Sequence, residues 1–276
     1  MSAGFSVANV GGVATVTIDN GPVNLFDLQL YQGLAALSHE LAADDDVRVV
    51  VLRSANPDFF IAHFDVGLIL TFPGDSPPPT ELSPFHQMCE AMRTMPKATI
   101  AVVEGRVGGG GSELLLSCDM RFAALDRAVF NQPEVALGII PGGSGTVRLG
   151  RLLGRSRALE VILGCDDVDA KLAEAWGWVN RALPADELWA FVDRLAARIA
   201  SFPPIAVAEA KASVLSVEKG IEADLLAEAA AFNRTLGDPR ARTAMTKFMA
   251  DGGQTPAQEL RLGDFAAELG IPPTTT

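Results

Sequence analysis

Cysteine and histidine are both scarce in this chain of 276 residues, which has three of each. The cysteines show no C-x-x-C spacing, and a small, odd count fits a reducing compartment better than a disulfide framework. We expect each to be a small core hydrophobe. None of the histidines lies in an H-E-x-x-H motif, so the sequence predicts no metal site and structural or solvated roles for them. The residues concerned are Cys89, Cys118, Cys165, His39, His63 and His86.

Basic side chains and long apolar runs are also few. Lysine and arginine total 22 against 34 aspartates and glutamates, and the formal net charge of −12 argues against neutralising the phosphates of a nucleic acid. No apolar stretch approaches the roughly 18 residues of a membrane span. The first residues lack the basic and apolar regions of a secretory leader. We therefore expect a cytoplasmic protein that binds neither nucleic acid nor membrane.

Several motifs that bind phosphate or carry a nucleophile are missing. The stretch GRVGGGGSE (Gly105 to Glu113) has no lysine and is not a P-loop, and no G-x-G-x-x-G follows a strand. Neither GGGSEL nor GGSGT completes G-x-S-x-G. These absences exclude phosphate cradles of those types and a serine nucleophile elbow.

Short β-branched runs do alternate with helical patterns through the first 200 residues, which is typical of βαβ organisation. A helix is predicted from Phe26 to Asp44. From Ser201 onward the chain consists almost entirely of alanine-rich helix formers. We therefore predict an α/β core over residues 1–200 and an all-helical segment over residues 201–276. The runs predicted as strands are VATVTID (Val13 to Asp19), VRVVVLR (Val47 to Arg53) and ATIAVVEG (Ala98 to Gly105).

One proline-rich segment interrupts this pattern. FPGDSPPPTELSPF, from Phe72 to Phe85, cannot form a central strand or a helix interior, because proline lacks the N–H group and clashes with the preceding turn. We expect a surface loop or lid.

A run of four glycines, Gly108 to Gly111, leads into the apolar segment that contains Glu113. Glycine is costly in ordered structure, so bare backbone at this strand end must serve a purpose. A helix that begins here would offer unpaired N–H groups and the positive end of its dipole. A second carboxylate, Glu134, follows Gln132 and Pro133, and Phe64 precedes a predicted helix N-cap, Asp65.

These stretches together resemble the enoyl-CoA hydratase/isomerase (crotonase) superfamily. The motifs are FFIAHFDVG, PKATIAVVEGRVGGGGSELLLSCDMRFAA, FNQPEVALGIIPGGSGTVRL and GCDDVDAKLAEAWGWVNRAL, and the resemblance runs from about Val13 through the C-terminal helices. It implies an α/β, crotonase-like spiral of ββα turns with a C-terminal helical trimerisation segment. It also implies a homotrimer, or a dimer of trimers (homohexamer), that acts on acyl-CoA thioesters without a metal or redox cofactor.

The resemblance assigns roles to individual residues. It implies an oxyanion hole formed by the backbone N–H groups of Phe64 and Gly110, which bind the thioester carbonyl. Hydratases of the family carry glutamates at the positions of Glu113 and Glu134, here expected to activate water and to protonate Cα. A side chain at any of the glycines 109–111 would obstruct the thioester. The remaining residues expected at the substrate are Ala62, His63, Asp65 and Gly109.

Reaction type stays open at this point, because the family includes several chemistries on one oxyanion hole. The leading function is hydration of a 2-enoyl-CoA. The alternatives are an enoyl-CoA isomerase, in which one glutamate shuttles a proton, and a catalytically silent acyl-CoA-binding protein. The plainer alternative for the glycines is close packing of a helix on the sheet. His63 replaces the family's usual glycine and Phe64 its common alanine, so Phe64 either favours an aromatic or short acyl group or fills the core.

Overall fold

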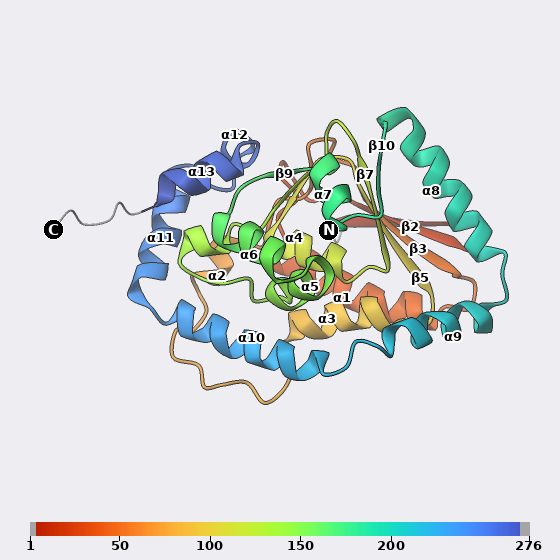
Figure 1. Ribbon diagram of the computed structural model, residues 1–276, viewed down its shortest axis with the longest axis horizontal. Coiled ribbons are helices and arrows are strands. Elements are labelled where there is room, and N and C mark those ends of the chain that lie inside the picture. Colours follow the sequence, from red (N-terminus) through yellow and green to blue (C-terminus); the bar gives the residue numbers. More distant parts are fainter. Residues whose placement is uncertain (1–3, 271–276) are drawn as a thin grey trace.

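The computed structural model describes residues 4–270, so the last six residues of the predicted helical segment lie outside it. Ten strands form two sheets (Figure 1). The larger sheet has the order β1-β2-β3-β5-β7-β10, in which only β1 and β2 pair antiparallel. Its strands are β1 (Phe5–Val10), β2 (Val13–Ile18), β3 (Val49–Ser54), β5 (Ala98–Val103), β7 (Met120–Ala124) and β10 (Arg181–Leu183).

The smaller sheet has the order β4-β6-β8-β9. From β3 to β8, successive strands alternate between the two sheets, and helices follow each pair, so that the chain advances as a spiral of ββα turns. The predicted fold class is confirmed. The strands of this sheet are β4 (Phe59–Ile61), β6 (Arg106–Gly108), β8 (Val129–Asn131) and β9 (Val168–Asp169).

Strand β3 shows why these residues form a central parallel strand. Val49 and Val51 point into a cluster with Leu188 and Val192 of α8 (Ala185–Ala200), which covers one face of the larger sheet. Val50 and Leu52 join the main core on the other face. Because both faces are buried, the strand is a continuous β-branched run rather than an alternating one.

Helix α1 (Leu28–Ala43) lies within the predicted range 26–44, and Asp27 caps it by accepting from the Leu30 N–H. The proline-rich segment is an irregular loop up to residue 83, as predicted, but Pro84 and Phe85 begin α3 (Pro84–Thr94). Proline is tolerated at the first helical position, since the N–H that it lacks has no intrahelical acceptor there.

The remaining helices of the first 200 residues surround the smaller sheet or connect the two sheets. They are α2 (Val66–Ile69), α4 (Gly109–Leu116), the 3-10 helix η1 (Glu134–Leu137), α5 (Gly145–Leu153), α6 (Arg155–Gly164) and α7 (Ala170–Trp176). The three cysteines are buried and free, as expected for core residues.

The C-terminal helices wrap around one edge of the molecule, from the end of α8 to the side that carries α2 (Figure 1). Phe248 and Phe265 of this segment pack in a cluster with Val66 of α2 and Leu137 of η1. The segment is therefore joined to the elements next to Phe64 and Glu134. Its helices are α9 (Pro204–Leu215), α10 (Ile221–Leu236), α11 (Pro239–Ala250), α12 (Pro256–Glu259) and α13 (Leu262–Leu269).

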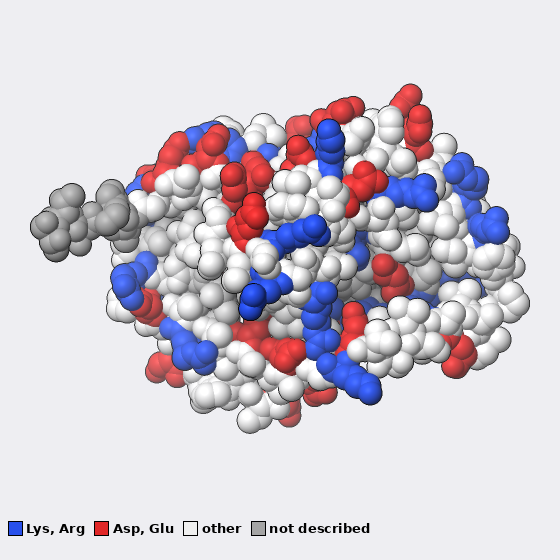
Figure 2. Space-filling model, viewed as in Figure 1, with Lys and Arg blue, Asp and Glu red and all other residues white. Residues whose placement is uncertain are grey.

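On the face that Figure 2 displays, acidic and basic side chains are interspersed. No helix within residues 4–270 is long and apolar enough to cross a lipid bilayer.

Candidate active site

The glycine run spans the end of a strand and the first turn of the helix that follows it, as predicted. Strand β6 ends at Gly108, and α4 begins at Gly109, which has a φ of +46°. The N–H groups of the first turn of a helix have no intrahelical acceptor. The Gly110 N–H is therefore available to a ligand, at the positive end of the helix dipole.

Each glycine of this turn avoids a different neighbour. A Cβ at Gly109 would lie 2.9 Å from Glu134 Oε1 and 3.0 Å from His63 Cβ. A Cβ at Gly110 would lie 3.5 Å from the Phe64 nitrogen and 3.6 Å from Phe85 Cζ. A Cβ at Gly111 would lie 2.6 Å from the carbonyl oxygen of Ile61, in the adjacent strand. Close packing thus explains Gly111, whereas Gly109 and Gly110 border the candidate site.

Phe64 is held beside Gly110 by a bridge to Phe26. The Phe26 N–H donates to the His63 carbonyl at 2.9 Å, and the Asp65 N–H donates to the Phe26 carbonyl at 3.2 Å. The Phe64 N–H takes no part in this bridge and lies on the side of Gly110. The two backbone donors expected for an oxyanion hole are therefore neighbours.

Asp65 and Ala62, which flank Phe64 and His63 in the chain, each have a structural role. Asp65 caps α2 by accepting from the Gly67 N–H at 2.9 Å, as predicted. Ala62 is buried in a small cluster with Val23 and Phe59, and its N–H donates to the Val23 carbonyl. The Ala62 side chain is thus a core contact behind the site.

Aromatic rings surround the Phe64 side chain. Its ring centroid lies 5.8 Å from that of Phe85, 6.3 Å from those of Phe26 and Phe72, and 6.5 Å from that of Tyr31. Phe85 also lies against the catalytic candidates, because a Cβ at Gly143 would be 2.5 Å from its ring and would contact Glu113 Oε2. Gly110 and Glu113 therefore both lie next to the Phe85 ring, at the edge of this aromatic cluster.

Glu113 lies on α4 and is 4% exposed. Its Oε1 accepts from the N–H groups of Gly143 and Gly145, each at 2.8 Å, in the turn that precedes α5. Burial raises the pKa of Glu113 well above its ordinary value, and the charges of Glu134 and Glu228 raise it further, against the lowering effect of the two N–H donors. Glu113 is thus a fixed carboxyl group with a high proton affinity.

Glu134 begins η1 and accepts from Gln132, whose side chain lies near Gly145, a donor to Glu113. The Gln132 side-chain nitrogen donates to Glu134 Oε1 at 3.2 Å, and a Cβ at Gly145 would lie 2.8 Å from that nitrogen and 3.0 Å from Glu113 Oε1. Within the described chain, the buried atoms Glu134 Oε2 and Gln132 Oε1 have no hydrogen-bond donor. Buried acceptors normally have a hydrogen-bond donor. These two oxygen atoms therefore suit the binding of a group that carries a hydroxyl.

The pKa of Glu134 is also raised, to about 7. Burial is the main cause, and the nearby His63 charge lowers the pKa in opposition. The structure therefore brings together two carboxyl groups, both with raised pKa values, and two backbone N–H groups. Such a pair can hold one proton between its members near neutral pH, which suits general acid–base chemistry.

His63 is part of a buried ion pair, a role that its isolated position in the sequence did not reveal. Its Nε2 lies 3.1 Å from Glu259 Oε1 and its Nδ1 lies 2.7 Å from the Phe64 carbonyl oxygen. Burial alone would lower the pKa of His63, but the Glu259 carboxylate outweighs it and raises the pKa to about 9. The ring is therefore an imidazolium that donates from both nitrogens.

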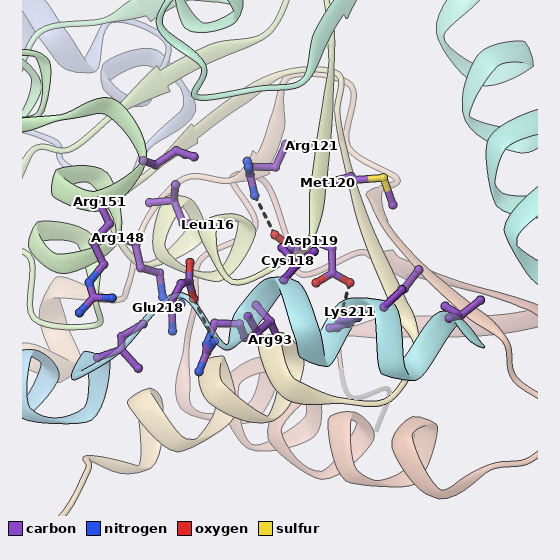
Figure 3. Close-up of a pocket in the computed structure, with 17 residues that line it drawn as sticks. Arg93, Leu116, Cys118, Asp119, Met120, Arg121, Arg148, Arg151, Lys211 and Glu218 are labelled. Atoms are coloured by element: carbon purple, nitrogen blue, oxygen red, sulfur yellow. Dashed lines mark hydrogen bonds and ion pairs between the residues drawn. The ribbon is translucent and has the colours of Figure 1, made fainter. Parts of the chain in front are cut away.

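A separate cavity of about 490 Å³ lies between α9, α5 and the edges of β5 and β7 (Figure 3), and neither Glu113 nor Glu134 lines it. Figure 3 shows Lys211 next to Asp119 and Arg93 next to Glu218 across this space. Most of the cations that line the cavity are paired in this way, so it offers little free charge to a ligand.

Known proteins share both the sequence and the fold. Residues 9–253 match the family model described as enoyl-CoA hydratase/isomerase. The chain is 32% identical to the short-chain-enoyl-CoA hydratase of Clostridium acetobutylicum over 87% of this chain and 92% of that protein. It is 38% identical to a probable mitochondrial enoyl-CoA hydratase of Dictyostelium discoideum, over 55% of each chain.

A solved structure from Streptomyces avermitilis, provisionally described as an enoyl-CoA hydratase, matches with a TM-score of 0.88 and 38% identity. The match covers 96% of this chain and 98% of that one. With the spiral of ββα turns and a family match over nearly its whole length, the chain belongs to the enoyl-CoA hydratase/isomerase (crotonase) family.

Proposed function

We propose that the protein adds water across the double bond of a 2-enoyl-CoA thioester. The observation that carries this proposal is the pair of carboxyl groups beside the first turn of α4, that of the buried residue Glu113 and that of the half-buried residue Glu134. Addition of water to Cα=Cβ needs a base for the water and an acid for Cα. An isomerase needs only one of these groups, so the presence of both favours hydration.

The reaction follows from this arrangement. The thioester oxygen accepts from the N–H groups of Phe64 and Gly110, which stabilise the negative charge that develops when Cβ is attacked. Glu113 takes a proton from water as the oxygen–Cβ bond forms, and Glu134 gives its proton to Cα. Transfer of the proton from Glu113 to Glu134 restores the starting state. Product and substrate then differ by one molecule of water, without a cofactor.

Kinetics of two single variants and the double variant test this proposal. Glu113→Gln and Glu134→Gln should each lower kcat by about 10²–10⁴-fold, the range for a general acid or base. The double variant should lose little more than the worse single one, because the two groups act as a unit. Glu160→Gln on α6, where the residue is exposed, is the matched control and should behave as wild type.

Other outcomes of this experiment identify the alternatives. If one glutamate is dispensable and a 3-enoyl-CoA is converted faster than a 2-enoyl-CoA, the protein is an isomerase. If the wild-type protein binds acyl-CoA thioesters but converts none of short, long or aromatic acyl groups, it is a silent binding protein.

We also propose a homotrimer or dimer of trimers as the working assembly. Leu152, Leu159 and Leu163 on α5 and α6 are 41–63% exposed. Val214 on α9 and Val217, two residues after the end of that helix, are 69% and 76% exposed. Burying such side chains against a second copy removes apolar area from water and favours association.

A further inference from the structure

Five successive backbone N–H groups at the beginning of α5 are divided between two carboxylates. Gly143 and Gly145 donate to Glu113, as described above. Ser144, Thr146 and Val147 donate to Glu228 on α10, at 2.6, 2.9 and 3.1 Å. One short stretch of backbone therefore fixes the candidate base on one side and a carboxylate of the C-terminal segment on the other.

Glu228 is built into this position. It is 4% exposed, and it also accepts from the Thr146 hydroxyl and from His86 Nε2 on α3. Ser144 precedes α5 with a φ of 103°, in the left-handed region that a serine rarely adopts, and its side chain does not cap the helix. The carboxylate of Glu228 takes the place of the missing cap, and it holds the turn in its unfavourable conformation.

We propose that Glu228 is a positioning residue for the reaction: by clamping the turn of residues 143–147, it places the N–H groups that orient the Glu113 carboxylate. This inference rests on the proposed function of Glu113 as the base. It makes the C-terminal helical segment a part of the active site. Loss of the clamp lets Gly143 and Gly145 move, and misplacement by about 1 Å is enough to cost about 10² in rate.

The charge of Glu228 provides a second, independent effect. The groups that face Glu113 are Glu134 from η1, Glu228 from α10 and the Cys89 thiol from α3, while His86 faces Glu228. The Glu228 charge raises the pKa values of both Glu113 and Glu134. Removal of that charge therefore lets the pair lose its first proton at lower pH.

Three variants of the full-length protein separate these effects. Glu228→Gln removes the charge and replaces one acceptor oxygen by a donor group. Glu228→Asp keeps the charge but shortens the side chain. Glu222→Gln is the matched control, because Glu222 is exposed near the start of the same helix. Each is assayed for kcat and KM with a short 2-enoyl-CoA from pH 5 to 10.

We expect Glu228→Gln to lower kcat by about 10²-fold with little change in KM. It should also move the acid limb of the kcat–pH profile to lower pH. Glu228→Asp should lower kcat at least about tenfold but leave the acid limb at the same pH, and Glu222→Gln should match the wild-type protein. An unchanged kcat in both Glu228 variants, or an unmoved limb in Glu228→Gln, overturns the proposal. If Glu228→Gln does not fold, kcat of Glu228→Asp decides.

A measurement without turnover keeps this inference separate from the proposed function. The titration of the Glu113 carboxyl can be followed by ¹³C NMR, with its signal assigned from its loss in Glu113→Gln. If the wild-type protein converts no 2-enoyl-CoA, the proposed function fails, yet the coupling is still tested. A shift of the Glu113 midpoint to lower pH in Glu228→Gln but not in Glu222→Gln supports the proposed coupling of Glu228 to Glu113, and equal midpoints refute it.

Discussion

Alanine substitution at two adjacent glycines, Gly110 and Gly111, should have opposite effects on function and stability. Both residues lie in the first turn of α4, so both variants gain similar helix propensity, about 1 kcal/mol. They differ in what the new methyl group meets. At Gly111 it would lie 2.6 Å from the Ile61 carbonyl oxygen and 2.7 Å from Ile61 Cβ, so the helix must move off the strand. Overpacking of this kind costs about 1–3 kcal/mol.

At Gly110 the nearest atom is Phe64 Cβ at 3.2 Å, which a small shift of the side chain relieves. The same methyl group would stand 3.5 Å from the Phe64 nitrogen, in the space beside the two N–H donors that a thioester oxygen must enter. Alanine keeps the backbone N–H, but a methyl group that keeps the thioester oxygen away from a donor has the effect of removing it, and loss of an oxyanion-hole donor typically costs about 10²–10³ in kcat. We therefore expect Gly110→Ala to fold normally and to lose activity by that factor.

The assay pairs thermal unfolding with turnover of a 2-enoyl-CoA and calorimetric binding of a saturated acyl-CoA. The Tm of Gly111→Ala should lie several degrees below that of Gly110→Ala, at about 2–4 °C per kcal/mol for a chain of this size. Gly110→Ala should have a Tm no lower than that of the wild-type protein and should lose binding and turnover. Wild-type binding and turnover in Gly110→Ala would refute the placement of the oxyanion hole, and equal Tm values in the two variants would refute the packing argument.

Three further predictions concern protonation and assembly. The pKa of His63 is raised from 6.5 to about 9, so its pair with Glu259 should stabilise the fold fully below pH 6.5. That contribution to the free energy of unfolding, at most ~3 kcal/mol, is lost as pH rises through 9. When the free energy is measured by urea unfolding at each pH, His63→Gln should abolish its dependence on pH. A free energy of unfolding that does not change with pH in the wild-type protein would contradict this prediction. We expect kcat/KM to rise with pH through about 7, where Glu134 and Glu113 together lose their first proton. A kcat/KM that is independent of pH between 5 and 9 would contradict acid–base catalysis by these two residues. Light scattering at micromolar concentration should give a multiple of three chains, whereas a monomer would exclude the proposed assembly.

Local patterns in the sequence predicted much of the fold. The β-branched run of β3, the Asp65 cap and the proline-rich loop all depend on residues close together in the chain. The backbone of the glycine run was more difficult, because a strand end and the first turn of a helix both accommodate glycine. Only the position of Ile61 against Gly111 shows that one of these glycines serves packing.

The supports of the candidate site could not be predicted, because they depend on tertiary contacts between distant parts of the chain. Glu228 lies 84 residues from Ser144, and Glu259 lies 196 residues from His63. In the sequence, both are ordinary acidic residues of amphipathic helices. Gln132 was visible next to Glu134, but its side chain acquires a role only when α4 brings Glu113 to the same place.

The origin of the oxygen in the product tests the central claim most directly. Wild-type protein is incubated with a short 2-enoyl-CoA in ¹⁸O-labelled water. The loss of conjugated thioester absorbance is recorded, and the mass of the product is determined by mass spectrometry. Hydration by Glu113 and Glu134 predicts that absorbance falls and that each product molecule carries one ¹⁸O at Cβ, with Glu113→Gln and Glu134→Gln both slowed. Movement of the double bond without uptake of label, or binding of the thioester without any conversion, would contradict the account.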